Sequence, residues 1–148
     1  DKQPGNIEHS ARVFGTYFFD NGLEIGAVYN WNSGTLYNKA ANVYVRHLPL
    51  RETSSYDFGG YDGTWIAPNN IASEKTPAYG TLDMRIKYNY EFGDGYEAEF
   101  FFDIFNVLDD QATIEEESYV AGSGSFDFGE AKDWVAPRRF YLGAKLVF

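Results

Sequence analysis

The chain of 148 residues contains no cysteine, one methionine and only two histidines. Without cysteine it can form no disulfide, no thiolate metal site and no cysteine nucleophile. His9 and His47 have no serine or aspartate at a spacing typical of a catalytic triad. The segment 122–125, Gly-Ser-Gly-Ser, lacks the strand-turn-helix context of a nucleophile elbow or phosphate loop. We therefore expect no catalytic residues, no cofactor and no metal.

Long apolar runs are also missing. No segment resembles a signal peptide or has the length of apolar sequence that a membrane-spanning helix needs. Membrane-spanning strands are short and alternate in polarity, so this absence does not argue against them. The chain starts at Asp1 without an initiator methionine, which suggests a piece excised from a longer protein.

Acidic residues outnumber basic ones, and the formal net charge of −10 disfavours binding to nucleic acid. Between Asp109 and Pro137 eight residues are acidic and only Lys132 is basic. Five of the acidic residues are possible oxygen ligands for Ca²⁺: Asp109, Asp110, Glu115, Glu116 and Glu117. Their spacing matches no calcium loop, so we favour a solvated acidic loop.

Aromatic residues make up 19% of the chain, and glycine is frequent at 15 residues. Aromatic, glycine-rich chains with short alternating segments are typical of all-β folds. A membrane barrel places its aromatic residues in girdles at the two interfaces, whereas a soluble β-sandwich packs them into its core. Composition alone does not separate these two possibilities.

Five segments alternate between apolar and polar residues, and we predict that each is a strand of about the length that crosses a membrane. Their expected ranges are 7–20, 23–33, 80–92, 96–108 and 138–148. The residues of 7–20 leave the orientation of that strand ambiguous near its end, where both sides are aromatic. We expect nine residues of the later strands to face lipid or an apolar partner: Leu82, Met84, Ile86, Tyr88, Phe100, Phe102, Leu142, Ala144 and Leu146.

The connections between these segments alternate in length. Asp20-Asn21-Gly22 and Gly93-Asp94-Gly95 have the composition of tight hairpin turns, whereas the other two connections are about 45 and 30 residues long. Outer-membrane barrels have short periplasmic turns and long extracellular loops. The pattern predicts an antiparallel up-and-down transmembrane barrel segment, with a last strand that pairs beyond this chain.

Three segments resemble the C-terminal end of TonB-dependent outer-membrane receptors. The first comprises 12–17, 21–27 and Asn32-Ser33-Gly34-Thr35, similar to a late-barrel hairpin that enters an extracellular loop at a Ser-Gly-Thr sequence. The second, Phe102 to Asp109, is similar to the penultimate strand, in which a Phe-Asn pair precedes Leu and Asp or Asn. The third, Pro137 to Phe148, is similar to the last strand with its Pro-Arg start.

This resemblance implies a barrel of about 22 strands with a plugged lumen, of which residues 1–148 would form the last five strands. The function it implies is binding and import of a scarce nutrient, such as a siderophore, an oligosaccharide or a peptide. The location would be the bacterial outer membrane, with the C-terminus periplasmic. The partners would be the rest of the barrel and its plug, lipid, the outer-membrane assembly machinery, and TonB through an N-terminal part absent from this sequence.

Two groups of residues are candidates for function under this interpretation. The assembly signal would be formed by Phe140, Tyr141, Leu142, Gly143, Leu146 and Phe148. Aromatic side chains that could stack on a ligand from the extracellular loops are Tyr56, Tyr61, Trp65 and Trp134. We expect the charges of the third and fourth predicted strands, 80–92 and 96–108, to pair across those strands and to contact the plug: Arg85, Lys87, Glu97, Glu99 and Asp103.

Two other functions fit the same sequence. One is a soluble β-sandwich that binds carbohydrate through Tyr61, Trp65 and Trp134. The other is a porin-like barrel without a plug. The substrate cannot be identified from these residues.

Overall fold

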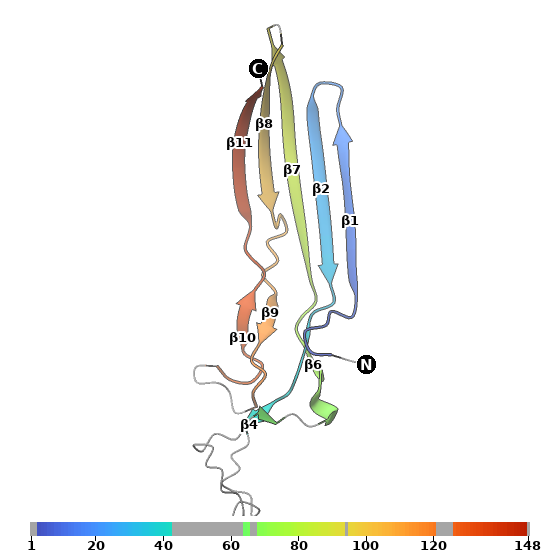
Figure 1. Cartoon of the computed structure of the whole chain (residues 1–148), viewed down its shortest axis with the longest axis vertical. Helices are drawn as coiled ribbons and strands as arrows, with labels where there is room; N and C mark the ends of the chain where they lie inside the picture. Colours follow the sequence, from blue (N-terminus) through green and yellow to red (C-terminus); the bar gives the residue numbers. More distant parts are fainter. Residues whose placement is uncertain (1–2, 43–63, 66–67, 94, 121–125, 148) are drawn as a thin grey trace, which may run out of the picture. The chain divides into compact units, whose positions relative to one another are not determined.

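A computed structural model describes residues 3–42, 64–65, 68–93, 95–120 and 126–147 (Figure 1). The described part is all-β, with one short 3₁₀ turn, η3, at Pro68–Asn70. It contains no helix that is long and apolar enough to span a membrane.

The chain divides into two compact units. The loop unit comprises Asp1–Glu8, Gly34–Pro77 and Thr113–Trp134. The sheet unit comprises His9–Ser33, Ala78–Ala112 and Val135–Phe148.

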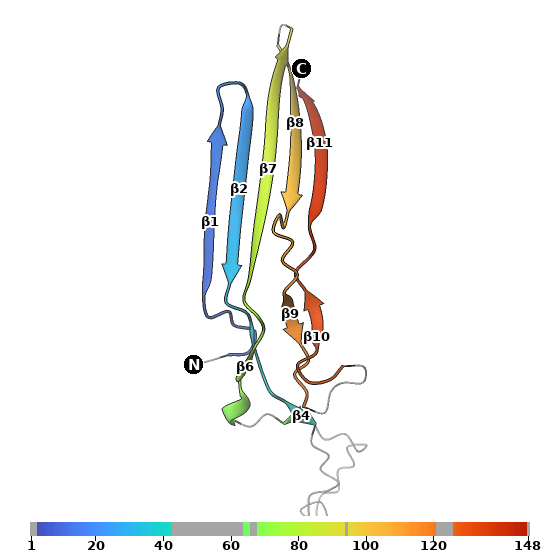
Figure 2. The ribbon, with the colours of Figure 1, turned by 180° about the vertical axis from the view of Figure 1, so that it is seen from behind.

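The sheet unit is one five-stranded antiparallel sheet (Figures 1 and 2). The order of the strands across the sheet is the same as their order along the chain. Its order is β1-β2-β7-β8-β11. The strands are β1 Ser10–Phe18, β2 Leu23–Asn32, β7 Tyr79–Phe92, β8 Tyr96–Phe105 and β11 Arg139–Val147. The prediction of five antiparallel strands in up-and-down order is confirmed.

The strand boundaries agree with the prediction to within two residues except at two places, where they differ by three. The first strand begins at Ser10, because Ile7 forms a separate bridge with Thr35 in the loop unit. The fourth strand ends at Phe105 rather than near residue 108. Asn106 has a φ of 53°, in the left-handed region, and a strand cannot continue through that backbone conformation.

The two tight turns lie at one end of the sheet and the two long connections start and finish at the other. The turn after β1 is closed by a bond from Phe19 N to Leu23 O (2.8 Å). At the opposite end, Asn32 pairs with Tyr79 where the first long connection leaves and returns. Arg139 pairs with Phe105 at the same end for the second. This is the arrangement that the connection lengths predict.

The loop unit contains short strands that the alternation pattern does not predict. β3 (Leu36–Tyr37) pairs with β6 (Glu74–Lys75), and β4 (Ala41–Asn42) pairs with β5 (Thr64–Trp65). β9 (Thr113–Glu116) pairs with β10 (Ala131–Trp134). Strands of two to four residues are too short to show a two-residue period, so the alternation pattern could not reveal them.

The two long connections meet within the loop unit. Ala40 forms a parallel bridge with Tyr119. The Ala40 N–H donates to Ser118 O (2.8 Å), and Val120 N donates back to Ala40 O (2.7 Å). These bonds join residues that are about eighty positions apart and give the long connections a common structure.

The expectation of a fully solvated acidic loop is wrong at Glu117, which is only 1% exposed. Lys132 Nζ lies 3.8 Å from a Glu117 oxygen and 3.4 Å from a Glu115 oxygen. Glu116 accepts a 2.6 Å hydrogen bond from the Tyr37 hydroxyl. Burial, together with that hydrogen bond, raises the pKa of Tyr37 above its usual range, so the hydroxyl stays protonated and continues to donate.

Gly34, at the centre of the Ser-Gly-Thr sequence, occupies a position that only glycine fits. Its φ is +92°, and a Cβ placed there would collide with the carbonyl oxygen of Thr76 and lie 2.9 Å from that of Pro77. The atoms in the way belong to the backbone and cannot rotate aside. A hydrogen bond from Thr35 N to Thr76 Oγ1 (2.9 Å) holds the residue after Gly34 against the same segment.

We therefore expect Gly34→Ala to destabilise the loop unit by about 2–4 kcal/mol, since it combines a left-handed alanine with a backbone clash. Gly5 is the matched control: its φ is +81°, and a Cβ there meets nothing within 4 Å. Gly5→Ala should cost only about 1 kcal/mol. Hydrogen exchange at the amides of Thr35 and Thr76 measures both effects, and equal exchange in the two variants would contradict the prediction.

Candidate functional site

The register of the five-stranded sheet separates its side chains into two faces of different chemistry. Residues directly opposite each other in paired strands lie on the same face. The apolar face, defined by this rule, contains Ala11, Val13, Gly15 and Tyr17 of β1; Leu23, Ile25, Ala27, Tyr29 and Trp31 of β2; Gly80, Leu82, Met84, Ile86, Tyr88, Tyr90 and Phe92 of β7; Tyr96, Ala98, Phe100, Phe102 and Ile104 of β8; and Phe140, Leu142, Ala144 and Leu146 of β11. None of these positions, all of them described, carries a charge.

This register places all nine residues predicted to face lipid or an apolar partner on the same face. It also resolves the ambiguous first strand, because Val13 pairs with Tyr29 and Tyr17 pairs with Ile25. Phe14, which pairs with Val28, belongs to the opposite face.

Aromatic residues are concentrated toward both ends of the apolar face. Near the tight turns, Tyr90, Phe92 and Tyr96 form a stack with ring centroids about 6 Å apart (6.2 and 6.0 Å). Near the long connections, Tyr29 and Trp31 occupy the last rows of β2. Aliphatic side chains fill much of the middle: Ile25, Leu82, Met84, Ile86, Ile104 and Leu142.

The apolar face is uncovered at many positions. Leu142 is 82% exposed, Val13 67% and Leu146 65%. The buried apolar residues of the described part are few and small or in the loop unit: Leu36, Ala40, Ala72 and Ala98. A continuous exposed apolar surface on this scale marks a site of contact with protein, lipid or another apolar medium.

The polar face, on the other side of the same strands, is organised by cross-strand pairs. Arg85 and Asp103 are directly opposite and form two parallel hydrogen bonds, from Nε to Oδ1 and from Nη2 to Oδ2, both 2.6 Å. Lys87 Nζ lies 2.9 Å from a Glu24 oxygen on β2 and 3.6 Å from a Glu99 oxygen on β8. The predicted pairing across β7 and β8 is thus confirmed for Arg85 with Asp103 and for Lys87 with Glu99.

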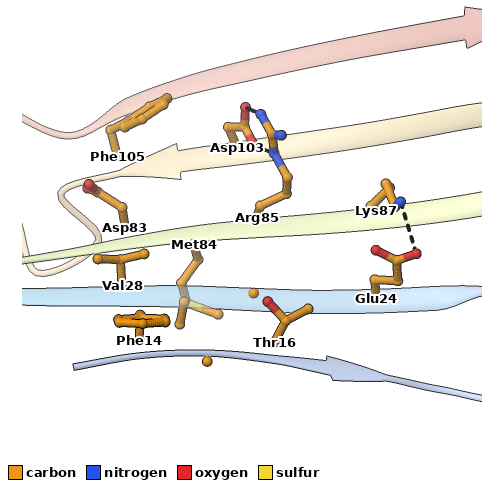
Figure 3. Close-up of a pocket in the computed structure, with 13 residues that line it drawn as sticks. Phe14, Thr16, Glu24, Val28, Asp83, Met84, Arg85, Lys87, Asp103 and Phe105 are labelled. Carbon is orange, nitrogen blue, oxygen red and sulfur yellow. Dashed lines mark hydrogen bonds and ion pairs between the residues drawn. The ribbon is translucent and has the colours of Figure 1, made fainter.

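A hollow of about 480 Å³ opens on the polar face over Gly26 (Figure 3). The row that crosses it consists of Thr16, Gly26, Arg85 and Asp103. The next row toward the long connections contains Asp83, with Phe14 and Val28 on one side and Phe105 on the other. The Lys87–Glu24 pair lies toward the tight turns.

Phe101 covers the one glycine of β11. Gly143 is directly opposite Phe101, and a Cβ on Gly143 would collide with the Phe101 ring. The Arg85 guanidinium lies over the same ring, 5.2 Å from its centroid. An aromatic ring packed over a cross-strand glycine helps to define the register of a strand.

Two of the segments that carry the family resemblance contact each other just beyond β8. Asn106 is 4% exposed, and its Nδ2 donates to Asp110 O (2.9 Å) and Ala136 O (2.8 Å). Asp109 Oδ1 accepts from Arg138 N (2.9 Å), and this bond holds the pKa of the Asp109 carboxyl below its usual range. The Phe-Asn sequence and the Pro-Arg sequence therefore form one clip that joins the end of β8 to the start of β11.

The chain was compared with models of protein families, with curated proteins and with solved structures. No match was found.

The predicted ligand-binding aromatics are not brought together in the described part. Tyr56 and Tyr61 lie outside the described residues. The backbone of Trp65 is in β5, opposite Ala41. Trp134 ends β10 and is 52% exposed. A ligand site in the long connections stays a prediction.

The predicted assembly signal lies on β11, apart from Phe148, which is outside the described residues. Phe140, Leu142 and Leu146 are on the apolar face, whereas Tyr141 and Gly143 are on the polar face. Phe140 stacks on Phe102 with centroids 5.9 Å apart. The described residues contain no group of acidic or histidine side chains arranged to hold a metal ion, and this includes the acidic residues named above.

Proposed function

We propose that this chain is the C-terminal part of the barrel of a TonB-dependent outer-membrane receptor that binds and imports a scarce nutrient. The observation that carries the membrane part of the proposal is the apolar face, which extends over five strands without a charge and is largely uncovered. In water such a face favours association, whereas in a bilayer it is the surface that lipid requires.

The dimensions of the sheet support membrane insertion. β2 and β8 have ten residues each and β11 has nine, about the length of a tilted strand that crosses the hydrocarbon core. Aromatic residues toward both ends of the apolar face correspond to the two interfacial girdles of such barrels.

The polar face supports an inward orientation for the other side of the sheet. Its charges pair with one another, as in the Arg85–Asp103 and Lys87–Glu24 pairs, and it also contains uncharged polar residues such as Asn30, which accepts from Arg12 Nε (2.7 Å). Lumen-facing residues of outer-membrane barrels are polar. With this orientation the tight turns are periplasmic and the long connections are extracellular.

The two edges of the sheet indicate the nearest partner. In the described part, β1 pairs only with β2 and β11 pairs only with β8. An unpaired edge in lipid costs several kcal/mol per backbone group, so both edges need strands. We propose that those strands come from the rest of the same barrel, and that β11 pairs with its first strand.

The transport function rests on the resemblance of the three segments described above. Their shared contacts give the resemblance a physical basis, because Asn106 and Asp109 in one segment bind the backbone around Arg138 in another. A plug and coupling to TonB belong to the same proposal.

Single-cysteine labelling in cells tests the membrane arrangement, and it benefits from the absence of cysteine from this chain. In the gene product that contains these residues, Ser73→Cys in the loop unit should react with a membrane-impermeant maleimide in intact cells. Asn21→Cys in the first tight turn should react only after the outer membrane is permeabilised. Labelling of both in intact cells, or a soluble product without detergent, would overturn the proposal and favour the carbohydrate-binding alternative.

Growth on limiting nutrient tests the transport part. Import that stops when TonB is deleted supports the receptor, whereas passive uptake that is unaffected by TonB indicates the porin-like alternative.

A further inference from the structure

A second hollow lies on the polar face of the sheet, over β8 and β11. Its space of about 290 Å³ is lined by Phe101, Asp103, Phe105, Arg139 and Tyr141. We infer that this aromatic hollow binds one sugar ring of a neutral oligosaccharide. The inference rests on the proposed function, and it deepens that function by naming the class of the imported nutrient.

The aromatic hollow lies at the end of the sheet next to the long connections. Phe105 is opposite Arg139, where the second long connection leaves and returns. Asp103 and Tyr141 form the next row toward the tight turns. In the proposed orientation this end of the lumen faces the outside of the cell. A nutrient that enters the lumen from outside therefore reaches these side chains early.

Aromatic rings form the walls of the aromatic hollow. The Tyr141 ring meets the Phe105 ring edge-on, with centroids 5.5 Å apart and planes at 88°, so the two rings make a corner. Phe101 bounds the other side, because its ring covers Gly143. Phe101 and Phe105 are separated by about 13 Å along the strand, which leaves room for a ring between them. The C–H groups of a sugar ring pack against the electron-rich faces of aromatic rings.

Polar groups at the edge of the aromatic hollow are available to a ligand. The Arg139 guanidinium lies over the Phe105 ring, 5.7 Å from its centroid, and forms no ion pair or side-chain hydrogen bond within the described part. The Tyr141 hydroxyl has no hydrogen-bond partner there either, and Tyr141 is 53% exposed. A guanidinium donates through several N–H groups, and a tyrosine hydroxyl both donates and accepts. These are the partners that sugar hydroxyls need.

The charges around the aromatic hollow balance, which favours a neutral ligand over an anion. Across β7, β8 and β11, the two rows nearest the long connections contain two carboxylates and two guanidinium groups: Asp83, Asp103, Arg85 and Arg139. Arg85 and Asp103 neutralise each other through two hydrogen bonds of 2.6 Å. An anion would meet no net positive charge in these rows, so its charge would gain little. A neutral ring depends only on stacking and hydrogen bonds.

The size of the aromatic hollow fits one ring. Ligand pockets have volumes of about 300–1,000 Å³, and this space of about 290 Å³ is at the small end of that range. The other rings of an oligosaccharide would lie along the lumen and make contacts of their own. Because linked contacts reinforce one another, losing one subsite should weaken binding without abolishing it.

Binding to the full gene product, purified from the outer-membrane fraction in detergent, tests the inference. The probes are neutral hexasaccharides of glucose, xylose, mannose, galactose and N-acetylglucosamine, and 2,3-dihydroxybenzoate is the anionic ring for comparison. We expect calorimetry to detect at least one hexasaccharide, with a Kd that is the same at about 50 and about 500 mM salt. Arg139→Gln and Tyr141→Ala should each raise that Kd about three- to tenfold, the effect of one lost ring or guanidinium contact.

Lys145→Ala is the matched control. Lys145 is on the polar face of β11, two rows from Tyr141 toward the tight turns, and does not line the aromatic hollow. Its loss should leave the Kd unchanged. Tyr141→Phe keeps the ring and removes the hydroxyl, so its effect should be smaller than that of Tyr141→Ala. If Tyr141→Ala does not assemble, Arg139→Gln is sufficient, because Arg139 is exposed.

Three results would overturn the inference. The first is that no hexasaccharide binds, and the second is that Arg139→Gln and Tyr141→Ala leave the Kd unchanged. The third is binding of 2,3-dihydroxybenzoate alone with a steep dependence on salt, which would indicate an anion site. Each leaves the proposed function intact, because TonB-dependent import can serve another nutrient. Absence of the protein from the outer membrane would instead contradict the proposed function.

Discussion

Leu142→Arg is expected to destabilise the membrane-inserted protein by about 2–4 kcal/mol, the cost of an arginine on the lipid face of a barrel near the midplane. Leu142 lies near the middle of β11, on the apolar face and opposite Phe102. It is 82% exposed, so its contacts within this chain are few and do little to offset the change. In a soluble protein the same substitution at an exposed position would be nearly neutral. The sign and size of the effect therefore report directly on lipid contact.

Tyr141→Arg is the matched control for this prediction. Tyr141 is adjacent in sequence and 53% exposed, but it is on the polar face, where its ring contacts Phe105 edge-on at 5.5 Å between centroids. Losing that contact should cost only about 1 kcal/mol. Urea unfolding of the full gene product in lipid vesicles measures both variants. If Leu142→Arg costs no more than Tyr141→Arg, the apolar face does not meet lipid.

Asn106→Ala is expected to reduce stability by about 2–4 kcal/mol, because it removes three part-buried hydrogen bonds at once. The carbonyl oxygens of Asp110 and Ala136 lose their donor, and Asp110 N loses the Asn106 Oδ1 acceptor at 3.2 Å. Alanine also tolerates the left-handed conformation of this position, with its φ of 53°, less well than asparagine. Unfolding of the assembled protein, followed by hydrogen exchange at the Asp110 amide, measures the loss.

Two further variants separate the causes of this effect. Asn106→Gly keeps the backbone conformation accessible but removes the side chain, so it should be about 1 kcal/mol less damaging than alanine. Leu108→Ala changes an exposed residue of the same turn and should alter stability by less than about 0.5 kcal/mol. An effect of Asn106→Ala as small as that of Leu108→Ala would show that the clip does not hold β8 and β11 together.

The sheet itself could be predicted from local features of the sequence. A two-residue alternation over ten or more positions, as in 81–92, has no helical alternative, and Asn-Gly or Gly-Asp-Gly turns specify where the chain reverses. Four of the five segments could also be assigned an apolar side in this way. Each of these signals depends on neighbours within a few residues, which is why they are visible in the sequence.

The candidate site depended on contacts between distant residues. The sequence predicts that Lys87 pairs across β7 and β8, yet its shortest ion pair is with Glu24 on β2. The hollow over Gly26 exists because four strands align Thr16, Gly26, Arg85 and Asp103 in one row. No short stretch of sequence contains that row. The burial of Glu117, which composition placed in a solvated loop, likewise arises from tertiary packing.

Side-chain alternation is a local property of the backbone, so the order of the residues suffices to predict long antiparallel strands with one apolar side. The turn residues and the spacing of the segments likewise predict which connections are short. Which side of β1 joins the apolar face depends on strand pairing, since Phe14 and Tyr17 are both aromatic and only the register with Val28 and Ile25 distinguishes them. The same is true of Asn106, whose role depends on the carbonyl of Ala136, thirty residues away. Register is set by the whole sheet at once, and alternation within one strand cannot specify it.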